Sequence, residues 1–78
     1  MSNLLIKIHK DDSYNNNTVI ILFNNYIMCQ LNKDKGIENI EIELFNDIAF
    51  YEDKFEIKMA LSSFRDILEN AKKVLINA

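Results

Sequence analysis

Residues 18–31 have the sequence TVIILFNNYIMCQL, in which two apolar runs flank Asn24 and Asn25. β-Branched and aromatic residues, which favour strands, are common in both runs. Asparagine adopts positive φ angles more readily than most other residues, so the pair can form a two-residue hairpin turn. We therefore expect a hairpin with strands over residues 18–24 and 26–32.

Both faces of this predicted hairpin are apolar. One face holds two cross-strand pairs, Leu22 with Ile27 and Ile20 with Cys29. The other face carries Val19, Ile21, Phe23, Tyr26 and Met28. A single helix covers only one side of a sheet, so either the sheet curls to bury both faces or one face stays exposed. An exposed face would suit a second copy of the chain or a different protein, because aromatic residues and methionine are enriched in interfaces.

Alternating apolar residues predict further strands on both sides of the hairpin. Leu4, Ile6 and Ile8 recur at every second position, and the even positions from Ile40 to Phe50 are apolar with one interruption. This period of two is typical of strands. The polar stretch 11–17 between the first two strands predicts a flexible loop. The full set of predicted strands is 3–10, 18–24, 26–32, 38–51 with a bend, and 54–59.

The C-terminal residues 62–76 predict an amphipathic helix. Its apolar face consists of Leu61, Phe64, Leu68, Ala71 and Leu75, which recur at helical spacing. We expect Ser62 or Ser63 to cap it, since Ser63 and Asp66 have the spacing of a capping box. One helix on one face of a five-stranded antiparallel meander gives a two-layer α+β fold, with residues 1–78 as a single domain.

Composition excludes several chemistries. The 78 residues carry a formal charge of −3 and include one cysteine, one histidine and one glycine. A single cysteine cannot form an internal disulfide, and one glycine is too few for a phosphate-binding loop. His9 with Asp11 and Asp12 matches no specific metal motif. We therefore expect a non-enzymatic protein without metal or cofactor, and Cys29 as a core residue.

The apolar runs, the single cysteine and the net charge also predict where the protein is located and what it binds. The longest apolar run, from Val19 to Phe23, is too short to cross a membrane. A free cysteine fits a reducing compartment, so we expect a cytoplasmic protein, in the host cell if a phage encodes it. The acidic balance disfavours direct binding to nucleic acid, which requires a basic surface.

An acidic stripe accompanies the predicted strand 38–51 and the turn after it. It consists of Glu41, Glu43, Asp47, Glu52 and Asp53. Such a stripe is either a solvated face or a surface that steers the chain towards a basic partner, such as a nucleic-acid-binding host protein.

Two resemblances extend these expectations. Residues 55–59, followed by Leu61, Phe64 and Leu68, resemble the last strand and helix of single-stranded-DNA-binding domains of the positive cofactor 4 type. That resemblance implies a single-stranded nucleic-acid binder. In size and acidity the chain is also similar to the small inhibitors, anti-CRISPR proteins among them, that phages encode against host nucleases.

The first functional hypothesis is an inhibitor that blocks the functional or nucleic-acid-binding surface of another protein. Phe23, Tyr26 and Met28 would anchor the contact, and the acidic stripe would steer it. The second hypothesis is a homo-oligomeric module in which hairpins pair across a two-fold axis. The third is a single-stranded nucleic-acid binder that uses Lys7, Lys10, Tyr14, Tyr26 and Lys33.

Overall fold

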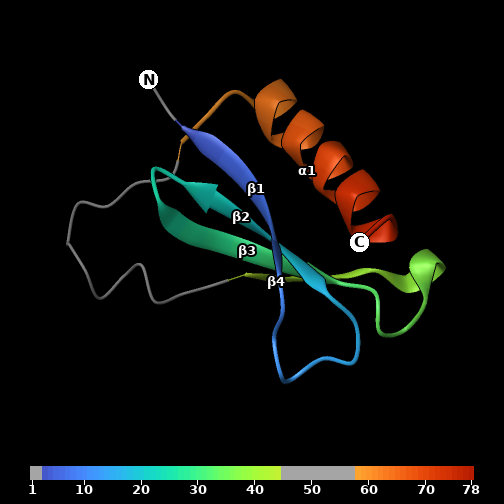
Figure 1. The fold of residues 1–78 in the computed structure, drawn as a ribbon. Helices are drawn as coiled ribbons and strands as arrows, with labels where there is room; N and C mark the ends of the chain where they lie inside the picture. The colour runs from blue at the N-terminus through green and yellow to red at the C-terminus, as the bar shows by residue number, and fades with distance from the viewer. Residues whose placement is uncertain (1–2, 45–57) are drawn as a thin grey trace.

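The computed structural model describes residues 3–44 and 58–78 (Figure 1). These residues form an α+β fold in which one C-terminal helix packs on an antiparallel sheet. The sheet has the strand order β1-β2-β3-β4. The elements are β1 (Leu4–His9), β2 (Thr18–Phe23), β3 (Tyr26–Asn32), the 3-10 helix η1 (Ile37–Asn39), β4 (Glu41–Leu44) and α1 (Leu61–Ile76).

The predicted hairpin turn is confirmed. Asn24 and Asn25 have φ angles of 50° and 71°, the left-handed values that a tight turn between twisted strands requires. The backbone N–H of Asn24 donates to the carbonyl of Asn3 at 2.8 Å, and the Asn24 side-chain oxygen accepts from the backbone N–H of Asn3, also at 2.8 Å. The turn therefore also holds the residue that precedes β1.

The register of the hairpin differs from the predicted one beyond its first two pairs. Leu22 lies opposite Ile27 as expected, but Cys29 lies opposite Ile21 rather than Ile20. Between these pairs β2 advances by one residue and β3 by two, which is a β-bulge. The extra residue is Met28, and the bulge allows Met28 and Cys29 to be buried in the same core.

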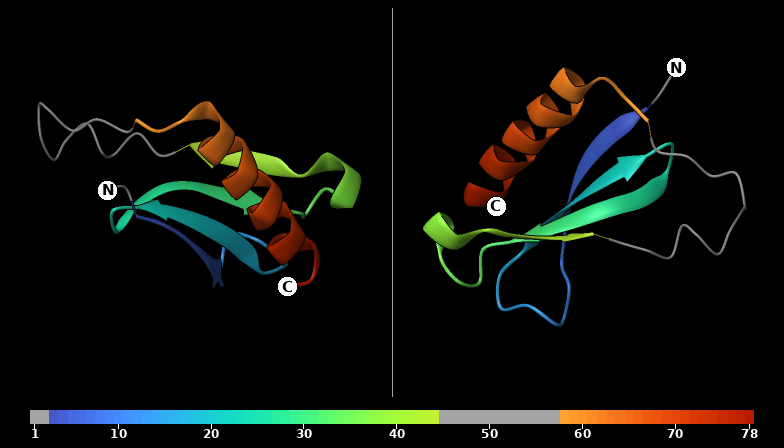
Figure 2. Two further views of the ribbon diagram at one scale, coloured as in Figure 1. Left: turned by 90° about the horizontal axis from the view of Figure 1, so that it is seen from above. Right: turned by 180° about the vertical axis from the view of Figure 1, so that it is seen from behind.

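The core lies between α1 and one face of the sheet, which we call the inner face. Figure 2 shows α1 crossing the strands diagonally on this face. The buried apolar residues are Val19, Ile21, Phe23, Met28, Cys29 and Leu31 from the sheet, with Ala71 and Leu75 from α1. The hairpin face that carries the aromatic Phe23 is therefore the one that the helix covers.

The long strand predicted over 38–51 is wrong in its first part. Residues 33–36 form a turn in which Gly36 has φ 102° and donates its N–H to the carbonyl of Lys33 at 2.9 Å. Ile37–Asn39 then forms one turn of 3-10 helix, and the strand begins only at Glu41. Residues 45–51 lie outside the described residues.

The end of the chain differs from expectation in two details. Of the strand predicted over 54–59, residues 58 and 59 are described and are not in a strand, while residues 54–57 lie outside the described residues. α1 begins at Leu61, with Ala60 as its N-cap and no side-chain cap. The predicted cap at Ser62 or Ser63 is wrong, because the Phe64 N–H already bonds the Ala60 carbonyl at 3.1 Å and places both serines in the first turn.

Candidate protein-binding surface

The face of the sheet opposite α1, which we call the outer face, carries an apolar row at its hairpin end. The strand register sets Leu5 opposite Leu22 and Leu22 opposite Ile27, so the three side chains form a line across β1, β2 and β3. Leu5 and Ile27 are 39% and 42% exposed. We call Leu5, Leu22 and Ile27 the outer row.

The next row on the same face is mixed in character. Lys7 lies opposite Ile20, Ile20 opposite Gln30, and Gln30 opposite Glu43. Ile20 and Gln30 are buried, whereas Lys7 and Glu43 are exposed. The outer row is thus bordered on one side by a cation at the β1 edge and a carboxylate on β4.

A polar network occupies the other end of the outer face. The Gln30 side-chain amide donates to the Thr18 hydroxyl at 2.7 Å and to the Asp11 carboxylate at 3.2 Å. The Thr18 hydroxyl in turn donates to the His9 carbonyl at 3.0 Å. These bonds satisfy the buried Thr18 and Gln30, because each polar group removed from water finds a partner in the protein.

The loop between β1 and β2 is held by further hydrogen bonds, contrary to the flexible loop expected from sequence. The Asp34 carboxylate accepts from the backbone N–H groups of Asn15 and Asn16 at 2.9 and 3.1 Å. The Tyr14 hydroxyl donates to the Glu43 carboxylate at 2.7 Å. The loop is therefore tied both to the turn after β3 and to β4.

Local hydrogen bonds shift the pKa of several of these groups. The backbone N–H of Asn15 holds the pKa of the Asp34 carboxyl below its ordinary value. The backbone N–H of Ser13, followed by the Gln30 amide, does the same for Asp11. These N–H donors stabilise the charged form of both carboxylates. The charged carboxylates in turn help to hold the loop backbone in place.

The structure places the three expected anchor residues mostly in the core. Phe23 and Met28 are only 4% and 6% exposed and belong to the cluster beneath α1. Tyr26, opposite Phe23 at the hairpin tip, is 41% exposed. The choice of the aromatic hairpin face as the free surface is therefore corrected, because α1 covers it, whereas no helix of the described residues covers the opposite face.

Two residues of the acidic stripe lie in the described part of the chain, and each has a local partner. Glu41 forms an ion pair with Lys35 at 3.0 Å, which lowers the pKa of its carboxyl. Glu43 accepts the hydrogen bond from Tyr14. The other three residues of the stripe, Asp47, Glu52 and Asp53, lie outside the described residues.

Cys29 is a core residue, as expected. Its side chain is fully buried and its thiol is free. Burial raises the pKa of the thiol to about 11, because a thiolate would lose its solvation. The neutral thiol is a poor nucleophile at physiological pH.

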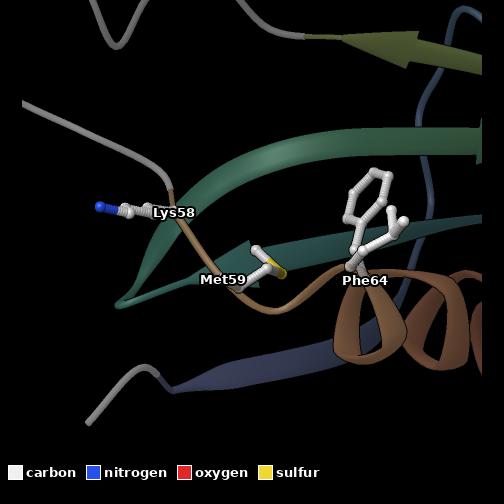
Figure 3. Close-up of a pocket in the computed structure, with 4 residues that line it drawn as sticks. Lys58, Met59 and Phe64 are labelled. Carbon is white, nitrogen blue, oxygen red and sulfur yellow. The ribbon is translucent and has the colours of Figure 1, made fainter.

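Two of the hollows in the described part of the chain lie along α1. One, of about 330 Å³, is lined by apolar residues of β3, β4 and α1, by Ile37 and Ile40 at η1, and by the charged residues Glu38, Glu69 and Lys72. The other, of about 360 Å³, lies at the start of α1 and is lined by Lys58, Met59, Leu61 and Phe64. Figure 3 shows the Met59 and Phe64 side chains turned to the same side of the backbone, while Lys58 extends away from them.

In the described part of the chain, no group of three or more acidic, histidine and cysteine residues is placed to hold a metal ion. None of the helices among the described residues has the length and hydropathy needed to cross a bilayer. The sequence predicts the apolar pair of Leu22 and Ile27 but not its extension to Leu5. The signal for Leu5 is that it is an apolar residue on the otherwise polar side of the first strand. Comparison with protein-family models, curated proteins and solved structures finds no match to this chain.

Proposed function

We propose that this chain is a non-enzymatic protein-binding inhibitor, of the kind that phages and other mobile elements encode against host defence, and that its outer face makes the contact. The observation that carries the proposal is the outer row of Leu5, Leu22 and Ile27, which crosses three strands on the face that no described helix covers. An apolar patch bordered by polar residues is the usual composition of a protein-binding site.

The charges near the outer row suit a protein partner. Lys7 can form a specific polar contact at the rim, and the net charge of −3 favours approach to a basic partner surface. Two of the five residues that would serve a nucleic-acid binder bond other groups of the chain. Lys33 bonds carbonyls at the end of α1, and Tyr14 bonds Glu43. A stacking and phosphate-neutralising face requires such groups to be gathered on one surface.

The test compares two isoleucine substitutions in the immobilised chain. Ile27→Lys places a charge in the outer row, whereas Ile37→Lys makes the same change in η1, at an isoleucine that is also exposed. From a host lysate, we expect the wild type and Ile37→Lys to retain the same partner. Ile27→Lys should weaken binding by about tenfold or more, because it places a charge inside the apolar part of the proposed interface.

Inhibition is then measured on the purified partner. Its activity should fall as the chain is added in stoichiometric amounts, and Ile27→Lys should restore it. Equal capture by all three proteins would place the contact elsewhere. A gel shift of single-stranded nucleic acid at low salt would favour the nucleic-acid hypothesis instead.

A further inference from the structure

β1 forms one border of the sheet, where an edge strand presents unpaired backbone groups. In the described part of the chain it pairs on one side only, with β2 (Figure 2). Four of its six side chains are exposed, among them Ile8 at 56%. An open edge that carries apolar side chains is a template for pairing with another strand.

The hydrogen bonds at the start of β1 determine which backbone groups face this open edge. The carbonyl of Asn3 accepts from the backbone N–H of Asn24, so the backbone of Asn3 faces β2. Backbone direction alternates along an antiparallel strand, so Leu4, Ile6 and Ile8 direct their N–H and C=O groups outwards. Their side chains lie on the inner face, where Leu4 and Ile6 pack against the core cluster.

The sequence of β1 is complementary to itself in one antiparallel register. If Ile6 lies opposite Ile6 of the partner subunit, Leu4 lies opposite Ile8 of the partner subunit. Each of the three outward-facing residues then both donates and accepts a hydrogen bond. On the outer face, Lys7 lies beside Leu5 of the partner subunit, so its alkyl stem can pack there while the ammonium group stays solvated.

The neighbouring registers are poorer. Centring the pair on Lys7 sets two lysines directly opposite each other, which is destabilising. Centring it on Leu5 sets Ile8 opposite Ser2 of the partner subunit, so an apolar side chain meets a polar one. The register centred on Ile6 is therefore the one in which backbone pairing, apolar matching and charge agree.

We propose that two copies of this chain pair through their β1 edges, antiparallel about a two-fold axis at Ile6, and form one continuous sheet. The axis is perpendicular to the sheet, so both α1 helices lie on one face and both outer rows on the other. A strand-edge contact is at the small end of specific interfaces, so the dimer forms in a concentration-dependent equilibrium. The proposal is independent of the inhibitor function.

The test measures mass and amide exchange over a range of protein concentrations. Sedimentation equilibrium should show the mass rising from 9.2 kDa towards twice that value. Over the same range, hydrogen exchange at the amides of Leu4, Ile6 and Ile8 should slow, because pairing buries them. The amides of Leu5 and Lys7 already face β2 and should change much less.

Two matched variants locate the interface. Ile8→Lys places a charge opposite Leu4 of the partner subunit and should keep the chain monomeric, while Ile37→Lys should dimerise as the wild type does. Both isoleucines are more than half exposed, at 56% and 53%, so neither change disrupts the core. Circular dichroism checks that both variants fold.

Three results would overturn the proposal. The first is a monomer at every concentration up to the millimolar range. The second is a dimer in which the amides of Leu4, Ile6 and Ile8 still exchange rapidly, since its interface would lie elsewhere. The third is loss of the dimer in Ile37→Lys as well as in Ile8→Lys. Ile27→Lys, which tests the inhibitor proposal, should dimerise normally. Failure of the dimer proposal and failure of the inhibitor proposal can therefore be distinguished.

Discussion

At the scale of single residues, Lys33 joins the sheet to the end of the helix. Its half-buried ammonium group donates to the carbonyls of Leu75 and Ala78, both at 2.9 Å. A cation at a helix C-terminus also interacts favourably with the helix dipole. Lys33→Met keeps the alkyl stem and removes both effects, so we expect the free energy of unfolding to fall by about 1–2 kcal/mol. Urea denaturation measures this, with Lys10→Met as the exposed control, and equal effects of the two substitutions would contradict it.

At the scale of elements, the hairpin turn depends on the positive φ of Asn25. Its value of 71° is strained for a residue with a β-carbon and relaxed for glycine. We expect Asn25→Ala to lower the free energy of unfolding by about 1 kcal/mol, and Asn25→Gly to leave it unchanged or raise it slightly. Both variants remove the same side-chain amide, so the difference between them in thermal or urea denaturation isolates the backbone conformation. A difference near zero would mean that the turn relaxes to another conformation.

Some features of the strands and loops depend on residues that are close together in the sequence, and others depend on residues that are far apart. The strands around Asn24 and Asn25 were predictable because alternation and turn chemistry act over a few residues. The bulge at Met28 was not, since it arises from packing beneath a helix more than thirty residues away. The same holds for the loop 11–17, whose polar composition suggested flexibility but whose backbone is held by Asp34.

At the scale of the whole molecule, the choice of hairpin face explains why the site was only partly predictable. Either face could have served as core, because both are apolar. The helix covers the face with Phe23 and Met28, where burying larger side chains removes more apolar surface from water. Phe23 and Met28, two of the three residues that suggested a partner surface, are thus buried on folding, and the outer row of aliphatic residues remains on the other face.

The stability of the whole molecule should decrease in alkaline solution because of Cys29. The unfolded thiol titrates near its ordinary pKa of 9.0, whereas burial raises the folded pKa to about 11. Between these values the unfolded chain binds fewer protons than the folded chain, so the free energy of unfolding falls as pH rises. Two pH units at about 1.4 kcal/mol each give a loss of about 2–3 kcal/mol.

Urea denaturation at a series of pH values checks this, in a Tyr14→Phe background. That background is needed because the hydrogen bond to Glu43 raises the pKa of the Tyr14 phenol above 10.0, which adds a decrease of the same sign. Adding Cys29→Ala should lower stability at neutral pH, since it leaves a small cavity, but should flatten the decrease that begins above pH 9.0. An equal slope with and without the thiol would mean that the alkaline loss has another origin and that water reaches Cys29 in the folded chain.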